Sequence, residues 1–197
     1  MKIINKNKNF FNKIAKYYDQ GILGIWLNEI SKKISEEIKI KNNSKILDAG
    51  CGTGNFLQVI SKNKTLKLEG IDLSSKMLEI AKKKLGNKAK LNLIPIEKIN
   101  YKTKFDYIFS TEAFHHYEDQ KKAMKNFYFA LKKNRKLIIA DLNFGKFFNW
   151  IFHMVEPGNS KMNSKKDFYK LFKEFGFRNI KQKKLGLFAI MTYGEKC

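Results

Sequence analysis

The hydrophobic residues of this chain change their spacing along its length. In the middle of the chain, short apolar runs alternate with segments whose apolar residues recur every three or four positions, which predicts buried strands and amphipathic helices in turn. The predicted strands are residues 45–49, 66–72, 91–94, 105–110 and 136–141, and the predicted helices are 74–85, 119–132 and 164–175. This alternation predicts an α/β fold in which helices cover both faces of a mainly parallel sheet.

The two ends of the chain depart from this alternation. Two helices are predicted before it, at about 8–18 and 24–40, and residues 177–183 and 187–193 predict an antiparallel pair of strands after it. The second helix is predicted from apolar residues at helical spacing, which are Ile22, Ile25, Trp26, Ile30, Ile34 and Ile38. A chain of 197 residues suits one domain with a hydrophobic core.

The formal net charge of +22 raises the question of a nucleic-acid partner. Only Arg135 and Arg178 among the 40 basic residues are arginines, however, and the lysines are spread along the whole chain. Because arginine is the side chain that suits phosphate and base edges best, nucleic acid is a partner that the sequence permits but does not favour. Two widely separated cysteines, Cys51 and Cys197, predict no disulfide and no metal site and fit a cytoplasmic location.

The clearest chemical signal is the segment 46–54, Ile-Leu-Asp-Ala-Gly-Cys-Gly-Thr-Gly. It predicts a buried strand that ends in a turn with glycine at every second position, Gly50, Gly52 and Gly54, followed by a helix. Glycine allows a sharp bend and a close approach of the backbone to a ligand. The order strand, turn and helix presents backbone N–H groups to a bound cofactor.

Two other residues are expected at the same edge of the sheet, because ligands of such sheets lie outside the carboxyl ends of the strands. Asp72 ends the second predicted strand, where its carboxylate can accept hydrogen bonds from both hydroxyls of a ribose, and Ser110 ends the fourth. The acid before the glycines, Asp48, helps to choose the cofactor. The pyrophosphate of NAD, which the fingerprint G-x-G-x-x-G binds, is an anion and would disfavour an acid at this position. The cationic amino-acid tail of S-adenosylmethionine would tolerate the acid. The pattern therefore favours S-adenosylmethionine over NAD.

With these motifs in order, residues 10–142 resemble the class I S-adenosylmethionine-dependent methyltransferases. Residues 46–54 are similar to the first motif of that family, and Asp72 matches its ribose-binding acid. Residues 11–19, Phe-Asn-Lys-Ile-Ala-Lys-Tyr-Tyr-Asp, resemble the N-terminal motif of the ubiquinone and menaquinone biosynthesis subgroup. The resemblance implies that Tyr18 lies over the cofactor.

The resemblance also implies a Rossmann-like, doubly wound sheet of seven strands, mostly parallel, with an antiparallel strand near the C-terminus. Within a single domain, 1–197, we expect a helical lid at 1–43, a cofactor-binding core at 44–142, an insertion on the acceptor side at 143–163, and a closing helix and strands at 164–197.

The chain departs from the family at the third strand. Ile94-Pro95-Ile96 stands where relatives often carry Gly-Asp-Ala, whose Asp meets the adenine amino group. The backbone N–H of Ile96 remains for adenine N1, and Glu97 is a substitute acid.

The residues after the fourth predicted strand face the expected acceptor side. His115 and His116 are candidate general bases, since a histidine pKa lies near neutral pH, although histidines at such a place more often cap the following segment or shape the pocket. Glu112 is a similar candidate. The aromatic run from Phe144 to Met154 is compatible with core, with a lid over the acceptor or with a peripheral membrane contact.

Methyl transfer is an in-line displacement with a neutral leaving group, so the enzyme mainly supplies orientation and desolvation. We expect a small-molecule acceptor. An RNA or protein methyltransferase, suggested by the net charge, and a non-catalytic S-adenosylmethionine-binding module remain as alternatives. Residues 110–114, Ser-Thr-Glu-Ala-Phe, lack the Asn/Asp-Pro-Pro-aromatic motif of enzymes that methylate exocyclic base nitrogens.

Overall fold

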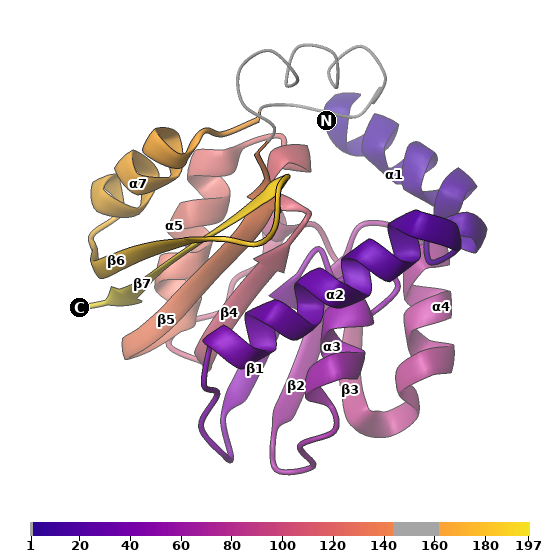
Figure 1. Cartoon of the computed structure of the whole chain (residues 1–197), viewed down its shortest axis with the longest axis horizontal. Helices are drawn as coiled ribbons and strands as arrows, with labels where there is room; N and C mark the ends of the chain where they lie inside the picture. The colour runs from indigo at the N-terminus through magenta and orange to yellow at the C-terminus, as the bar shows by residue number, and fades with distance from the viewer. Residues whose placement is uncertain (1, 144–161) are drawn as a thin grey trace.

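The computed structural model describes residues 2–143 and 162–197, so the aromatic run from Phe144 to Met154 lies outside the described residues. One seven-stranded sheet, in the order β3-β2-β1-β4-β5-β7-β6, forms the centre (Figure 1). Neighbouring strands from β3 to β5 are parallel, and β7 is antiparallel to both β5 and β6. The strands are β1 (Lys45–Ala49), β2 (Lys67–Asp72), β3 (Ala89–Leu93), β4 (Phe105–Thr111), β5 (Leu131–Leu142), β6 (Phe177–Lys184) and β7 (Ala189–Lys196).

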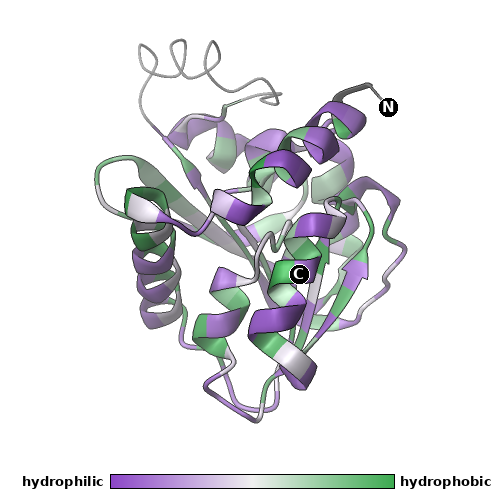
Figure 2. Cartoon of the chain, turned by 90° about the vertical axis from the view of Figure 1, so that its right-hand side faces the viewer, coloured by the Kyte–Doolittle hydropathy of each residue, from purple (hydrophilic) through white to green (hydrophobic). Residues whose placement is uncertain are grey.

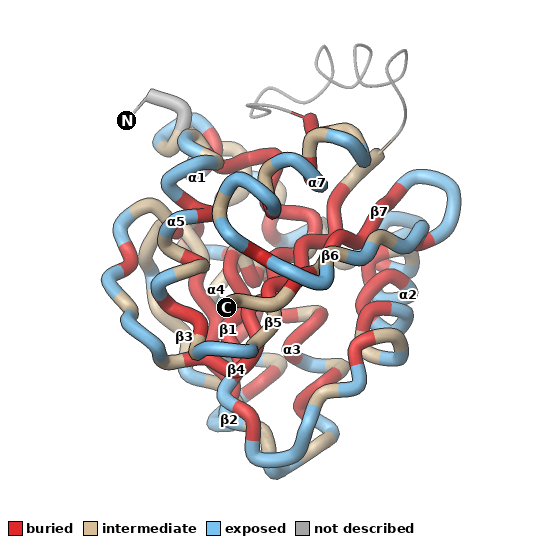
Figure 3. The backbone as a smooth tube through the Cα atoms, turned by 90° about the vertical axis from the view of Figure 1, so that its left-hand side faces the viewer, coloured by how far each residue is buried: buried red, intermediate tan, exposed pale blue. Residues whose placement is uncertain are grey.

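Helices cover both faces of this sheet, because the side chains of each central strand alternate between two apolar clusters. In β4, Tyr107 and Phe109 pack with the helices on one face of the sheet, whereas Ile108 packs with the helices on the other face. Figure 2 shows that the helices carry both polar and apolar residues. Figure 3 shows that the buried residues are concentrated in the central strands. The helices are α1 (Lys2–Ile14), α2 (Gly21–Glu37), α3 (Asn55–Ile60), α4 (Ser75–Leu85), α5 (Gln120–Ala130) and α7 (Lys165–Glu174), with 3₁₀ turns at Ala15–Tyr17, Gly86–Lys88, Ile96–Lys98 and Phe114–His116.

The predicted α/β fold is confirmed, and the main differences lie at the ends of its elements. The first helix begins before residue 8 and gives way to a 3₁₀ turn after Ile14. The second helix ends before residue 40, because Ile38 leaves the helical conformation with ψ 90°. Strands β3 and β7 are shifted by about two residues from their predicted positions, 91–94 and 187–193.

The junction between α5 and β5 differs most from the prediction. The helix ends at Ala130 instead of 132, and the strand begins at Leu131 instead of 136. Leu131 is already extended and pairs with Phe105, and the register then shifts before the next pair. Asn134 takes the left-handed conformation, with φ 59°, inside this irregular stretch. Periodicity did not predict it because the run Lys-Lys-Asn-Arg contains no apolar residue.

The apolar stripe of α2 is only partly buried, which corrects the prediction. Ile30, Ile34 and Ile38 are buried in the core, but Ile22 is 87% exposed and Ile25 is 68% exposed. Toward its N-terminus, the helix instead buries Gly24 and Leu27. Among the described residues, no helix combines the length and hydropathy that a membrane crossing requires.

Helix α1 bridges the segments that follow two different strands of the sheet. Asn12 Oδ1 accepts a hydrogen bond from Ser74 Oγ, just after β2, at 2.7 Å. Asn7 Nδ2 donates to the carbonyl oxygen of His116, after β4, also at 2.7 Å. The ring of Phe11 stands edge-on to His116, with ring centroids 4.8 Å apart. The helix is therefore anchored on both sides of the carboxyl edge of the sheet.

Candidate active site

The glycine turn follows β1 and is held by the neighbouring strand. The amides of Gly50 and Cys51 both donate to the carbonyl oxygen of Ile71, at 2.8 and 2.9 Å. Gly50, Gly52 and Gly54 all have positive φ, from 52° to 81°, which a side chain would strain. A Cβ on Gly50 would also lie 2.5 Å from the Cβ of Ala113. A Cβ on Gly52 would meet no protein atom within 4 Å, so the space beside this residue is open to a ligand.

Asp72 joins the end of β2 to the glycine turn. Its Oδ2 accepts from the Gly52 amide at 2.9 Å, and its Oδ1 accepts from the Ser74 amide at 2.8 Å. Burial raises the pKa of Asp72, while these backbone hydrogen bonds oppose the shift. Each carboxylate oxygen retains a further acceptor position, so the group can still bind the hydroxyls of a ribose.

Asp48 is a buried acid with an unused oxygen. Its side chain is 2% exposed, and Oδ1 has no hydrogen-bond partner among the described residues. Burial, together with the nearby charge of Asp72, raises the pKa of Asp48 to about 8. Because an unpaired buried carboxylate is costly, this oxygen marks a place for a cationic ligand group. The cationic amino-acid end of S-adenosylmethionine fits this place.

Tyr117 is a site residue that the sequence did not single out. Its hydroxyl donates to the carbonyl oxygen of Ala49 at 2.8 Å, directly before the glycine turn. Ser110 Oγ lies 2.9 Å from the same hydroxyl. Because the Tyr117 hydroxyl already donates its proton to Ala49, the Ser110 hydroxyl donates to the Tyr117 oxygen. Ser110 thus holds Tyr117 rather than lining the pocket. Burial raises the pKa of Tyr117 well above its usual value, so the hydroxyl keeps its proton.

A pocket with about 920 Å³ of empty space, including its opening, lies along this edge of the sheet. Of the predicted site residues, Tyr18, Asp48, Gly50, Gly52, Asp72, Ile96 and His116 line it. Gly54, Ser110 and His115 are not among the lining residues. Gly54 is instead the N-cap of α3, where a Cβ would lie 3.2 Å from the Cβ of Ala81.

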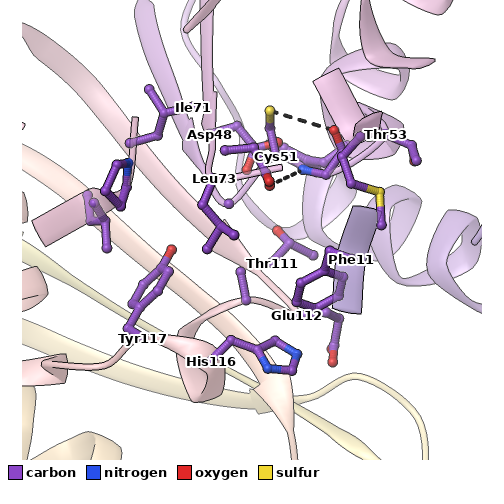
Figure 4. A pocket seen from close by; sticks show the side chains of 18 of the residues that line it. Phe11, Asp48, Cys51, Thr53, Ile71, Leu73, Thr111, Glu112, His116 and Tyr117 are labelled. Atoms are coloured by element: carbon purple, nitrogen blue, oxygen red, sulfur yellow. Dashed lines mark hydrogen bonds between the residues drawn. The ribbon is translucent and has the colours of Figure 1, made fainter. Parts of the chain in front are cut away.

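The two neighbouring histidines lie in different environments, and only His116 lines the pocket. His115 is buried, and its Nδ1 and its backbone amide both contact the carboxylate of Asp141 at the end of β5. His116 lines the pocket beside Phe11, and Glu112 lines it nearby (Figure 4). The backbone of Glu112 is left-handed, with φ 51°, and its amide donates to the Ala140 carbonyl oxygen at 2.8 Å. His115 therefore supports the segment from which His116 and Glu112 reach the pocket.

The other end of the pocket is formed after β3. Pro95, Ile96 and Glu97 all line it. Glu97 Oε1 accepts from the amide of Glu118 at 3.1 Å, and burial raises the pKa of the Glu97 carboxyl.

The N-terminal segment is fastened to the glycine turn through Asp19. Its Oδ1 accepts from Thr53 Oγ1 and Asn55 Nδ2, both at 2.7 Å. Its Oδ2 pairs with Lys84 Nζ of α4 at 2.7 Å, and the lysine also donates to Asn55 Oδ1. Although burial raises the pKa of Asp19, the hydrogen bonds from Lys84, Thr53 and Asn55 leave it below its usual value. This cluster links the N-terminal segment, α3 and α4.

Replacing Asp19 by alanine should therefore loosen the N-terminal segment and the glycine turn together. Because three partners lose a charged acceptor, we expect a loss of about 2–3 kcal/mol in the free energy of unfolding and roughly tenfold weaker S-adenosylmethionine binding. Denaturant titration and calorimetry measure the two effects. The control is Glu79→Ala, which removes only an exposed pair with Lys76 on α4. Equal results for Asp19→Ala and Glu79→Ala would contradict the linking role.

The strand order, with β7 inserted antiparallel between β5 and β6, and the glycine turn beside Asp72 define a class I methyltransferase fold. A family model described as a methyltransferase domain matches residues 20–182. The chain therefore belongs to this family of S-adenosylmethionine-dependent methyltransferases.

Relatives named as methyltransferases agree with this assignment, and solved structures share the fold. The chain is 34% identical over 151 residues to malonyl-[acyl-carrier protein] O-methyltransferase 1 of Ilyobacter polytropus, covering 71% of this chain and 54% of the relative. It is 27% identical to a demethylmenaquinone methyltransferase of Chlorobaculum tepidum, covering 94% and 72%. A chain of the solved "complex between the Haloferax volcanii Trm112 methyltransferase activator and the putative methyltransferase" superposes with a TM-score of 0.84 at 15% identity, covering 94% of this chain and 96% of that chain. The chain spans little more than half the length of the first of these relatives.

Proposed function

We propose that the chain transfers the methyl group of S-adenosylmethionine to a small-molecule acceptor held beneath α1. The observation that carries this proposal is the shared lining of one pocket. Ile4, Phe11 and Tyr18 of the N-terminal segment line the same space as Asp48 and Asp72. A pocket roofed in this way suits an acceptor that can be enclosed, because exclusion of water and fixed orientation are the main contributions to methyl transfer.

The described geometry supports the following cofactor contacts, which are part of the proposal. Asp72 accepts hydrogen bonds from the ribose hydroxyls, and Asp48 faces the cationic amino-acid end. The backbone of Gly50 and Gly52 approaches the ligand closely, and the Ile96 amide faces the adenine. Bound S-adenosylmethionine supplies an electrophilic methyl group on a positively charged sulfur.

The other proposed residues act on the protein side of the site. Gly54 allows α3 to pack closely, and Ser110 holds the Tyr117 hydroxyl. Tyr18 covers the cofactor, a role supported by the resemblance of residues 11–19 to the quinone-biosynthesis subgroup. His116 contacts the acceptor, and His115 holds His116 in position. Cys51 and Cys197 are free thiols, which supports a cytoplasmic location.

Methyl-labelled S-adenosylmethionine tests this proposal. The purified protein is incubated with it and a whole extract of the organism that encodes the chain, and the small-molecule, RNA and protein fractions are then separated. We expect label in the small-molecule fraction and its loss with Asp72→Ala. Label confined to RNA or protein would overturn the small-molecule acceptor, and the absence of label from every fraction would support a non-catalytic module.

A further inference from the structure

Exposed apolar side chains gather at the corner where α1 gives way to α2, on the right in Figure 1. Tyr17 is 62% exposed and Leu23 is 47% exposed, and Ile22 and Ile25 of the same segment also lie outside the core. These four residues are called the corner patch below. Single exposed apolar residues are ordinary, whereas a cluster of large ones marks a candidate interaction surface.

Tertiary contacts hold the corner patch in place. Asp19 fastens the turn between the two helices to the glycine turn and to α4. At the start of α2, Gly24 is buried against this same turn, and a Cβ on Gly24 would lie 2.0 Å from the carbonyl oxygen of Asp19. Because the helix turns Gly24 inward at this close contact, its neighbours Ile22 and Ile25 remain on the outside. The exposure of the patch is therefore built into the packing of the corner.

The charge beside the corner patch is positive. Four exposed lysines lie on α1 and on the 3₁₀ turn that follows it, namely Lys6, Lys8, Lys13 and Lys16. Nζ of Lys16 lies 5.9 Å from the ring centroid of Tyr17. Asp19 is the only acid from residue 2 to residue 28, and its charge is paired with a lysine of α4. Glu29, the next acid, is paired with Lys32.

We propose that the corner patch and these four lysines dock the protein onto a lipid bilayer with anionic headgroups. The apolar side chains enter the boundary between headgroups and acyl chains, and the lysines meet the headgroup phosphates. Docking of this kind needs no membrane-spanning helix, and none is found among the described residues. The proposal goes beyond methyl transfer and does not depend on it.

The combination of apolar and cationic residues favours a bilayer over other partners. A nucleic acid would attract the lysines, but its phosphate backbone has no apolar layer to receive Ile22 and Ile25. A second copy of the chain, paired through the same surface, would bring two groups of lysines together, and like charges across an interface are unfavourable. An anionic bilayer presents negative charge at its surface and apolar chains directly beneath it.

The proposed docking surface adjoins the candidate active site. Tyr18, which follows the exposed Tyr17, lines the pocket, and so does Leu27 on the buried side of α2. The segment that joins the two helices therefore contributes to both the pocket and the corner patch. Docking through this segment holds the pocket close to the bilayer surface.

Substitution of two patch residues by lysine separates insertion from attraction by charge. The variant Ile22→Lys/Ile25→Lys adds positive charge while it removes two apolar side chains. Cosedimentation with phosphatidylcholine vesicles that contain about one third phosphatidylglycerol measures the affinity. We expect the wild type to bind these vesicles and the variant to bind roughly tenfold more weakly. Attraction of the lysines alone predicts the opposite result, a variant that binds more tightly.

The matched control is Phe129→Lys/Tyr169→Lys, which adds the same charge at two exposed aromatic residues of α5 and α7. These helices pack on the opposite face of the sheet from α2. We expect the control to bind at least as tightly as the wild type, and circular dichroism verifies that both variants are folded.

Three results would overturn the proposal. The first is a wild type that does not bind the vesicles. The second is binding by Ile22→Lys/Ile25→Lys that is as tight as binding by the control, since lysine attraction would then suffice. The third is a lipid-free dimer in gel filtration that the same variant abolishes, since a second copy of the chain would then cover the corner patch.

Discussion

Asp72→Ala should weaken S-adenosylmethionine binding by roughly 100-fold or more. The carboxylate is expected to accept both ribose hydroxyls, and hydrogen bonds to a charged group contribute about 1.5–3 kcal/mol each. It also accepts the Gly52 amide at 2.9 Å, so its removal frees the turn that approaches the cofactor. Titration calorimetry of the folded variant measures the loss.

The controls for this variant separate ribose binding from support of the turn. Asp72→Asn keeps one oxygen acceptor for the backbone and loses the charge, so we expect binding between those of the wild type and the alanine variant. Glu36→Ala removes an exposed acid and should bind as the wild type does. Wild-type affinity in Asp72→Ala would contradict the assignment of the ribose site.

Asp48→Asn should make the ligand-free protein more stable, increasingly so as the pH rises. The pKa of Asp48 is raised from 3.8 to about 8 in the folded protein. Between these values the folded state keeps a proton that the unfolded state releases, so the wild-type free energy of unfolding falls as pH rises. Asparagine does not ionise. The difference between the variant and the wild type should therefore grow by up to about 1.4 kcal/mol per pH unit between about pH 4 and 8.

The same substitution should weaken cofactor binding and reduce the dependence of that binding on pH. A cationic ligand group favours the ionised form of Asp48, so the wild type releases a proton on binding below about pH 8. The affinity of the wild type for S-adenosylmethionine should therefore rise with pH relative to that of Asp48→Asn. Because the ligand titrates in the same way with both proteins, the ratio of the two affinities reports only on Asp48. Denaturant titration and calorimetry from pH 5 to about pH 8 measure both effects. Parallel curves for the two proteins would contradict the proposed role of Asp48.

Much of the fold could be predicted because its signals are local in the sequence. The alternation of apolar runs and amphipathic segments, with the resemblance, gave the doubly wound sheet, and the glycines of 50–54 gave the turn. Ser74 and Ser164 begin helices α4 and α7 as N-caps, as their side chains suggest. The ends of helices and strands were predicted less accurately where a run of polar residues carries no periodic signal, as at the irregular start of β5.

The residues that sequence analysis missed act through contacts between distant segments. Asp19 closes the quoted segment 11–19, but its partners Thr53 and Lys84 lie 34 and 65 positions away. Tyr117 follows the two histidines, and nothing in its neighbours indicates that its hydroxyl meets Ala49. Ser110 was expected at the cofactor and instead reaches Tyr117. Such roles depend on tertiary packing, so only the motif around Asp19 carried a usable signal.

The structure of the protein bound to S-adenosylhomocysteine tests the central claim most directly. We predict that the ribose hydroxyls bind Asp72, that the amino group of the ligand lies at Asp48, and that the sulfur faces the side of the pocket formed by Glu112 and His116. A complex in which the nucleoside lies away from Asp72, or in which the ligand occupies another part of the protein, would contradict this account.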